Sequence, residues 1–504
     1  MAKKSDMKRP QSVNAEFDDS FDATSNGGEV LVERVLRRLG LRRHIDKLLP
    51  KRSDAAKFSM VEGLYALMCG LLVGGRGIKA AETLRKNRMD SRIFGLENGA
   101  PSEGSMHNIL GDMAGLAPRK LKDAYTQAGP CQPSLDMFGR EATSRKLRRV
   151  VPDEPEAALA NNLQMMWTFT AAVALRCLKT IKSYVIKVHG FTVVFCDATA
   201  LEVDGRCFDA AEQIYTGARA LLWSTIMVGP IIVAESLGLG ARDEAKTIPA
   251  LLSRAKKVVD EIKGRFARVL SLLDAAYFEK EVVEELREMG WKFIICANRL
   301  RGALERIAAE RPELFWHKTG PDERRGWADS QFCVFSYRPE GWDFDVTIMA
   351  CRSRETDDLP GTWRYSFLGT DLEIGDLPKH RIKKHGYARY IWMLYSTKQG
   401  RENHYKTALT DFGLHHPPSS RLGIDQAFYA VGSAAANIAM VIRYRVVRGD
   451  DRGIRFWRFR ERYIRIAGRI VEGGRTLTVR MSGACVDVAR QALWLSAFSE
   501  AALL

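Results

Sequence analysis

Two short apolar segments, each running directly into an aspartate, constrain the fold of this chain more than any other feature. They are Thr192–Asp197 and Ala267–Asp274. Valine, leucine and phenylalanine favour a buried strand, whereas a carboxylate at its end loses solvation unless it has a partner or a metal. The sequence therefore predicts two core strands that bring Asp197 and Asp274 to a polar site.

The order of the elements around these strands indicates the fold class. Strands are predicted at about 191–203, 220–228 and 231–238, then a helix at 244–263, a strand at 267–274, a helix at 279–289 and a strand at 291–296. Three successive strands followed by alternating helices and strands are typical of a ribonuclease-H-like fold, a mixed sheet flanked by helices. In such a fold, acidic residues from neighbouring strands and a later helix meet at one edge.

We predict a multi-domain α/β protein, because 504 residues are long for one core. The ribonuclease-H-like catalytic core is interrupted by a β-rich insertion, since the connection before the next helix is too long for a loop and has strand patterns of its own. An all-α N-terminal domain precedes the core, because apolar residues recur there at helical spacing. The predicted segments are a disordered tail (1–28), a helical DNA-binding domain (29–125), a linker and helix (126–190), the first part of the core (191–300), the insertion (301–390), the second part of the core (391–440) and a basic C-terminal region (441–504).

The stretch Tyr395–Asp411 supplies a candidate third carboxylate, Glu402. On a helix, the spacing places these residues on one polar and basic face: Tyr395, Lys398, Glu402, Tyr405, Lys406 and Leu409. One interpretation is a solvated face with lysine–glutamate pairs. The other is that Glu402 joins Asp197 and Asp274. Three carboxylates can hold hard divalent cations, and two such ions can activate water and stabilise the leaving oxygen of a phosphodiester, so the implied chemistry is phosphoryl transfer.

The charge balance favours a polyanionic partner. Lysine and arginine outnumber aspartate and glutamate 77 to 61, a formal net charge of +16, although charge alone does not separate DNA, RNA and anionic membrane. Arg443–Arg469 holds ten arginines against three acids, interleaved with aromatic residues. As a strand it would place arginines and aromatics on opposite sides and form a groove for DNA. The alternative is a solvated hairpin face.

Two other regions have both a binding and a structural interpretation. The short basic helices of 29–125 fit either a helix-turn-helix-like DNA reader or a helical scaffold with a solvated surface. In the insertion, Trp316, Trp327, Arg324 and Arg325 could stack on a base or bind phosphates, whereas aromatics in a small sheet are more often core.

The remaining composition indicates a cytoplasmic protein. Nine cysteines lie without any Cys-x-x-Cys pair, which favours neither a disulfide framework nor a zinc site. The N-terminus has no apolar core of a signal peptide. The longest apolar stretch, Ala220–Gly240, is interrupted by Gly229-Pro230 and Glu235, so we expect a buried strand pair there and no membrane span.

Three motifs, in this order, resemble the catalytic blocks of bacterial insertion-sequence transposases. They read Asp-Ala-Thr-Ala-Leu-Glu-Val from 197, Leu-Asp-Ala-Ala-Tyr-Phe from 273 and Arg-Glu-Asn-His-Tyr-Lys-Thr-Ala-Leu-Thr-Asp from 401. Pro-Ser-Glu-Gly-Ser from 101 and Trp-Arg-Phe-Arg-Glu-Arg-Tyr from 457 add to the similarity. More narrowly, the sequence is similar to the insertion sequence 1380 family within the insertion sequence 4 superfamily.

The resemblance implies a DDE transposase in which Asp197, Asp274 and Glu402 are catalytic and bind two Mg²⁺ ions, with Mn²⁺ as a substitute. The superfamily's Tyr–Arg–Glu–Lys pattern falls on Tyr395, Lys398 and Glu402, with lysine in place of arginine and Leu409 in place of the final lysine, for which Lys406 is the nearest candidate. The expected DNA contacts are Tyr395, Lys398, Arg401, Lys406, Arg443, Arg445, Arg455, Arg458 and Arg460.

The expected partners are double-stranded DNA at the element ends and at the target, and a second copy of the chain, since two ends must be held. The expected location is the bacterial cytoplasm, in association with the nucleoid. Two alternatives are a catalytically silent or domesticated DNA-binding protein and a ribonuclease-H-like nuclease that cuts without joining. Glu202 and Asp204 are the rival carboxylates near Asp197.

Overall fold

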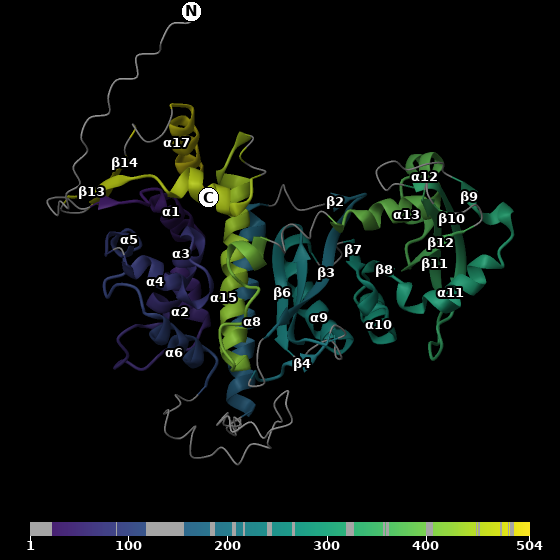
Figure 1. The fold of residues 1–504 in the computed structure, drawn as a ribbon, viewed down its shortest axis with the longest axis horizontal. Helices are drawn as coiled ribbons and strands as arrows, with labels where there is room; N and C mark the ends of the chain where they lie inside the picture. The colour runs from purple at the N-terminus through teal and green to yellow at the C-terminus, as the bar shows by residue number, and fades with distance from the viewer. Residues whose placement is uncertain are drawn as a thin grey trace, which may run out of the picture.

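The computed structural model describes residues 23–86, 88–116, 156–181, 187–203, 208–214, 217–238, 244–264, 268–318, 327–355, 358, 362–399, 407–449, 451, 454–473, 476–481, 483 and 488–503. It is a mixed α/β structure with a large mixed sheet (Figure 1). A group of N-terminal helices lies at one end, the sheet extends to the other, and two long helices lie between them.

The N-terminal helices surround one apolar helix, α3. The elements are α1 (Glu29–Leu39), α2 (Leu41–Leu48), α3 (Met60–Val73), α4 (Ala80–Lys86), α5 (Arg88–Ile93) and α6 (Glu103–Met113). A capping box starts α3, because Ser59 Oγ accepts from the Glu62 amide while Glu62 accepts from the Ser59 amide. Ser102 caps α6, because its hydroxyl accepts from the Ser105 amide. Since α3 is buried on nearly every side, it forms the centre of this helical group.

Two helices distant in sequence, α8 (Glu156–Thr180) and α15 (Leu422–Val441), pack side by side between the N-terminal helices and the sheet (Figure 1). Helix α15 is buried along almost its whole length. Its Asn437 accepts from the Ile232 amide and donates to the Ile232 carbonyl, both at 2.8 Å. The buried amide of Asn437 is therefore satisfied, and these two bonds fix the helix to the sheet.

The central strands follow the predicted order. They are β3 (Phe191–Glu202), β5 (Arg219–Val228), β6 (Ile231–Gly238), β7 (Val269–Leu273) and β8 (Lys292–Cys296). Strands β6, β5 and β3 are antiparallel neighbours, and β7 and β8 continue the sheet parallel to β3. Helices α9 (Glu244–Lys263) and α10 (Lys280–Glu288) connect them, so each of the predicted strands and helices of this region is confirmed.

The strands predicted in the insertion extend this same sheet. They are β9 (His317–Lys318), β10 (Trp327–Tyr337), β11 (Val346–Glu355) and β12 (Arg364–Thr370), preceded by α11 (Arg301–Ala309). Strand β12 pairs antiparallel with β8, and Thr370 Oγ1 donates to the Phe293 carbonyl at 2.6 Å. With β2 (Lys187–Val188) and β4 (Glu212–Gln213), the described residues form an 11-stranded sheet.

The C-terminal basic region is helical where the sequence suggested a strand. A π-helical turn (Ile442–Val446) ends α15, and α16 (Phe456–Phe459) runs into a second π-helical turn (Arg460–Ile464). The strand prediction is wrong because the aromatic residues follow helical spacing: Phe456 stacks on Phe459 at 5.0 Å, and Phe459 on Tyr463 at 5.1 Å.

A hairpin and a helix complete the C-terminal region: β13 (Gly468–Gly473), β14 (Thr476–Met481) and α17 (Val488–Ala502). Strand β13 also pairs with β1 (Ala23–Thr24), so the end of the predicted N-terminal tail is held here, while residues 1–22 lie outside the described part of the chain. Helix α17 packs on α1. The two ends of the sequence thus contribute to one helical group.

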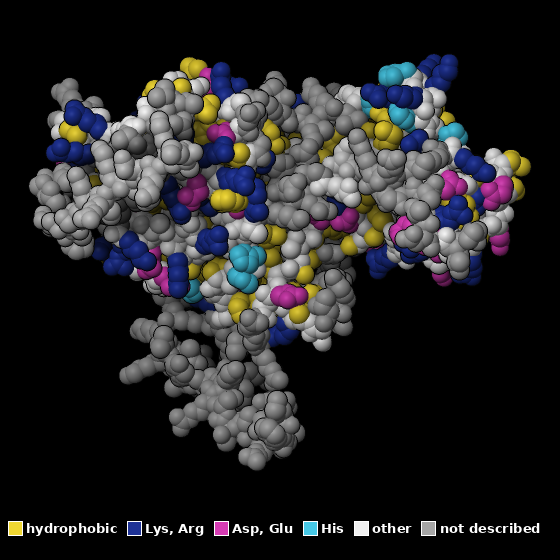
Figure 2. Space-filling view, turned by 45° about the horizontal axis from the view of Figure 1, so that its top comes forward, with side chains coloured by type: hydrophobic (Ala, Val, Ile, Leu, Met, Phe, Trp, Pro, Cys, Tyr) yellow, Lys and Arg dark blue, Asp and Glu magenta, His cyan; other side chains and the backbone are white. Residues whose placement is uncertain are grey.

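No single helix in the described part of the chain is long and apolar enough to cross a membrane; α3 and the segment 77–86 meet those criteria only as a pair bent by 103°. Basic side chains are spread over the surface in Figure 2. A dense group of lysine, arginine and histidine side chains lies at the end of the molecule that carries α12 (Lys379–His385).

Candidate active site

The sheet brings Asp197 and Asp274 opposite one another. Strands β3 and β7 pair in parallel from Thr192 beside Val269 to Phe195 beside Leu272. Two residues further in the same register place Asp197, still inside β3, opposite Asp274, the first residue after β7. Both strands are apolar up to this point, so the predicted strand ends and their aspartates are confirmed as neighbours.

Lys398 lies against both aspartates. Its ammonium nitrogen is 2.6 Å from Asp274 Oδ2 and 3.7 Å from Asp197 Oδ1, and only 12% of its side chain is exposed. The residue follows α13 (Tyr387–Ser396), whose last turn reaches the end of β7. The interpretation of Lys398 as part of a solvated helix face is therefore wrong, because its side chain is mostly buried and its ammonium group contacts both carboxylates.

Tyr395 comes to the same place from α13. Its hydroxyl lies 3.1 Å from the Leu273 carbonyl and 3.3 Å from Asp274 Oδ1, both of which are acceptors. Burial raises the pKa of Tyr395, and the negative charge of Asp274 raises it further, so the phenol keeps its proton and remains a donor. Tyr395 thus fixes the orientation of the Asp274 carboxyl.

The Asp197 carboxyl is held in an environment that favours its protonated form. Burial raises the pKa of Asp197 to about 6; Lys398 opposes this shift, whereas the negative charge of Asp274 adds to it. The Ala198 amide donates to Asp197 Oδ1 at 3.0 Å and holds that carboxyl in place. The neighbouring Cys196 is buried, which raises the pKa of its thiol to about 12, so it is not a reactive thiolate.

The predicted helix from Tyr395 to Leu409 does not continue as one element. Helix α13 ends at Ser396, Thr397 and Lys398 form a turn, and Gln399 is helical again. Residues 400–406 lie outside the described part of the chain, and a π-helical turn occupies Thr407–Asp411. The prediction is wrong at this break because the Ser396 and Thr397 hydroxyls donate to the carbonyls of Met393 and Leu394 and compete with the helix.

Glu402, Arg401 and Lys406 lie outside the described residues. Within the part that is described, no three side chains of the types His, Cys, Asp and Glu gather closely enough to hold a metal. Of the rival carboxylates, Glu202 is exposed at the end of β3, five residues beyond Asp197, and Asp204 is outside the described residues. The described carboxylates at the site are therefore Asp197 and Asp274.

The C-terminal arginines have different environments. Arg460 is buried and donates to the carbonyls of Leu71 and Leu72, so it joins α3 to the C-terminal region and is not available to DNA. Arg455 reaches Thr410 Oγ1 at 2.9 Å and pairs with Asp411 at 3.4 Å. Arg458 is exposed beside the partly exposed Trp457, while Arg443 and Arg445 are half-buried.

In the insertion, Trp316 packs inside the protein. Trp316 is 4% exposed, and the Arg352 guanidinium lies 4.2 Å from the centre of its ring. The structural interpretation of Trp316 is therefore confirmed. Arg324 and Arg325 lie outside the described residues, as does the side-chain environment of Trp327.

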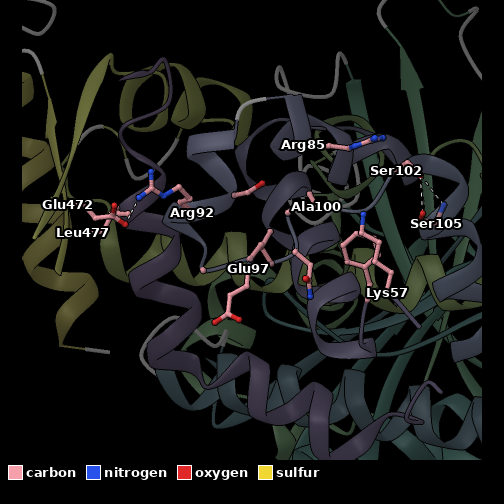
Figure 3. Close-up of a pocket in the computed structure, with 15 residues that line it drawn as sticks. Lys57, Arg85, Arg92, Glu97, Ala100, Ser102, Ser105, Glu472 and Leu477 are labelled. Atoms are coloured by element: carbon pink, nitrogen blue, oxygen red, sulfur yellow. Dashed lines mark hydrogen bonds and ion pairs between the residues drawn. The ribbon is translucent and has the colours of Figure 1, made fainter. Parts of the chain in front are cut away.

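A separate cavity of about 590 Å³ opens among the N-terminal helices and the β13–β14 hairpin (Figure 3). Lys57, Arg85 and Glu97 line it, and Arg92 forms an ion pair there with Glu472. None of its lining residues belongs to β3, β7 or α13. The cavity is thus distinct from the carboxylate pair.

Comparison with protein-family models identifies a transposase family. A family model described as transposase DDE domain group 1 matches residues 229–501, a span that contains Asp274 and Lys398 and begins after Asp197. No curated protein matches the sequence. Among solved structures, the cryo-EM structure of the piggyBac transposase synaptic complex with hairpin DNA is similar over 82% of this chain and 72% of that chain, with 11% identity and a TM-score of 0.37. That likeness is too distant to carry any inference about the site.

The family match runs from the start of β6 to the last turn of α17 and includes the second aspartate of the opposed pair with the lysine that neutralises it. Because it spans more than half of the sequence, this protein belongs to the family of transposase DDE domains, group 1.

Proposed function

We propose that this protein binds the ends of its own mobile element and cuts and joins DNA, with Asp197, Asp274 and Glu402 as the metal-holding carboxylates. Membership of a DDE transposase family indicates a DNA-cutting and DNA-joining enzyme. The observation that carries the site assignment is the placement of Asp197 opposite Asp274 on parallel strands, with the Lys398 ammonium 2.6 Å from Asp274.

The residues present fit hard divalent cations. DDE transposases generally use divalent metal ions. Here the donors are carboxylate oxygens, the ligands that Mg²⁺ prefers. The pKa of Asp197 is raised first by burial and then by the negative charge of Asp274, and a cation bound beside the two carboxyl groups would favour their charged forms. We propose two Mg²⁺ ions, with Mn²⁺ as a substitute. When bound, such ions activate water and stabilise the leaving oxygen of a phosphodiester.

The protein side chains have positioning tasks. The Ala198 amide and the Tyr395 hydroxyl orient the two aspartates, so the carboxylates themselves need little reorientation when a cation and DNA arrive. Lys398 places a positive charge where the scissile phosphate would lie, and Arg401 and Lys406 follow it in the chain. Outside the site, Arg458 with Trp457 offers an exposed cation and ring for the DNA backbone.

Several finer features belong to the same proposal. The strand order β6, β5, β3, β7, β8, antiparallel then parallel, supports a ribonuclease-H-like core. The three sequence blocks support membership of the insertion sequence 1380 family. For such a bacterial protein we propose a location in the cytoplasm, close to the nucleoid. Since two element ends must be held together for joining, we propose a homodimer on double-stranded DNA.

The test uses the full chain, Mg²⁺, a duplex carrying the inverted repeat that flanks its gene, and a supercoiled target plasmid. Asp197→Asn, Asp274→Asn and Glu402→Gln should each abolish cleavage and leave duplex binding nearly unchanged, because only metal ligation is lost. Glu202→Gln, on the same strand as Asp197, is the matched control and should retain activity. Full activity in any of the three variants would contradict the assignment. A wild-type protein that cuts without joining would be a nuclease, and one that binds without cutting would be a catalytically silent relative.

A further inference from the structure

We infer that helix α12 is a docking surface for the phosphate backbone of duplex DNA. This inference rests on the proposed function, since it takes DNA as the substrate. In seven residues, α12 carries Lys379, Arg381, Lys383 and Lys384, with two histidines and no acid. All four cationic residues are exposed, and the apolar Ile382 is partly buried against the core. The helix therefore turns its charge toward solvent.

The charged groups of these four side chains are unpaired within the part of the chain that the structure describes. No ion pair or hydrogen bond is found there for any of their charged groups, although cations nearby are paired. Asp376, just before the helix, is engaged by Arg268 at 3.1 Å and by Lys292 at 3.6 Å. A surface helix that serves only solubility usually intersperses both signs of charge. Helix α12 carries one sign only.

The pKa values of two neighbouring histidines reflect the positive charge of this surface. Desolvation lowers the pKa of His385, and the charges of Lys384, Arg389 and Arg381 lower it further. His189, next to β3, responds likewise to desolvation and to Arg381. Figure 2 shows lysine, arginine and histidine side chains gathered at this end of the molecule. The mutual repulsion of these cations is a cost that a polyanion would relieve.

The position of α12 relates it to the carboxylate pair. Gly386, with φ of +75°, turns the chain from α12 into α13, and the far end of α13 delivers Tyr395 and Lys398 to the aspartates. At a rise of 1.5 Å per residue, α13 is about 15 Å long. That is about half a helical turn of B-DNA, so a duplex engaged at the site can also reach α12.

The location of α12, on the side of the site away from the N-terminal helices, indicates which part of a bound duplex it would contact. In Figure 1 the N-terminal helices lie at one end of the molecule and α12 at the other, with β3 and β7 between them. A duplex held by the N-terminal helices and cut at Asp197 and Asp274 would meet α12 beyond the cut. Two DNAs share that chemistry, the duplex flanking the element and the target. A membrane surface fits less well, because α12 has no exposed apolar face to insert.

The test measures binding of the full chain to a labelled mixed-sequence duplex of about three helical turns by fluorescence anisotropy, over a series of KCl concentrations. The variant K379Q/R381Q/K383Q/K384Q should bind at least tenfold more weakly at low salt. The slope of log affinity against log salt should fall by up to about 3.6, since each of the four phosphate contacts contributes about 0.9. The variant's thermal midpoint should match the wild type, which excludes misfolding.

A control variant, K179Q/K256Q/K280Q/R301Q, removes the same net charge from side chains that are paired with acids elsewhere. It should leave the slope unchanged. Equal losses in both variants would mean that only net charge matters, and an unchanged α12 variant would mean that the helix does not touch DNA. Either result overturns the inference, as does wild-type binding to phosphatidylserine vesicles in preference to the duplex.

Two further arms separate the DNA sources and the two proposals. If the variant loses affinity for an element-end duplex only when flanking sequence is attached, the surface holds the flank; if cleavage is normal and only joining to the plasmid falls, it holds the target. If the wild type does not cut DNA, the proposed function is contradicted, whereas a lower salt slope in the α12 variant would still support DNA docking on α12. If cleavage is normal and the wild type and the α12 variant have equal salt slopes, only the docking inference is rejected.

Discussion

The ammonium nitrogen of Lys398 lies 2.6 Å from Asp274 Oδ2, and the same nitrogen is 3.7 Å from Asp197 Oδ1. One side chain therefore offsets the charge of both carboxylates. A divalent ion bound by these oxygens would have to compete with it. Lys398 consequently stabilises the two carboxylates in the free protein, and its ammonium group has to move when metal and DNA bind.

Lys398→Met should increase the affinity of the site for Mn²⁺ several-fold, because the competing charge is gone, while DNA cleavage falls by about tenfold or more, roughly 1.4 kcal/mol of transition-state stabilisation. Without metal the variant should lose about 1–3 kcal/mol of folding stability, because a mostly buried Asp197 loses its counterion. Calorimetric Mn²⁺ titration, cleavage rates and thermal unfolding check this. Lys292→Met, which removes a cation from two other aspartates, should leave Mn²⁺ affinity unchanged.

Tyr395→Phe should slow cleavage several-fold, because the Asp274 carboxyl loses the donor that orients it. The loss of folding stability should be about 0.5–1.5 kcal/mol, as for one hydrogen bond. Tyr387→Phe is the matched control on the same helix, since the Tyr387 hydroxyl also donates to a backbone carbonyl, that of Leu372. If both variants slow cleavage equally, the effect is on α13 as a whole and not on Asp274.

Asn437→Leu should cost about 3 kcal/mol of folding stability, because the amide and carbonyl of Ile232 lose their partners inside the core. Leucine has a similar volume, so the loss reflects unsatisfied polar groups more than a cavity. Urea denaturation of the two proteins measures it. A loss below about 1 kcal/mol would show that other groups or water satisfy the Ile232 backbone.

Glu235 should make folding stability fall as pH rises. Burial raises the pKa of Glu235 to about 7, from an ordinary value of 4.5, against hydrogen bonds from Ser433 and Trp223 that lower it. Between those two pH values the folded state keeps a proton that the unfolded state has released, so stability decreases with rising pH and levels off above about 7. In Glu235→Gln this component should disappear. Urea midpoints from pH 4 to 8 compare the two slopes, and parallel slopes would contradict the assignment.

The sequence predicted the central strands and the meeting of Asp197 with Asp274, because apolar, β-branched segments ending in a carboxylate leave few alternatives. It could not predict the turn at Lys398, where short-range bonds of Ser396 and Thr397 end the helix. The burial of Arg460 depends on carbonyls almost 400 residues away at Leu71 and Leu72 and is equally invisible in a pattern.

Helical periodicity also could not show whether the N-terminal helices fold without the rest of the chain. Since α3 and α6 pack on α15, and Arg460 bonds to the last turn of α3, a fragment ending near residue 125 would expose the surface that α15 covers. Circular dichroism of such a fragment should show loss of cooperative unfolding, and DNA recognition by these helices is best measured in the full chain. The α12 run Lys379–His385 did carry a local signal, since cations without an intervening acid are visible in the sequence.

The pairing of β12 with β8 has a mechanical consequence. Because β8 pairs with β7, an unbroken ladder of backbone hydrogen bonds runs from the strand that precedes Asp274 to the strands of the insertion. A hinge between the two would have to break that ladder. The insertion, with α12 and α13 attached, is therefore expected to act as a stiff arm whose angle to Asp197 and Asp274 is set at folding. A bend needed to align flanking DNA, site and target must then be supplied by the DNA.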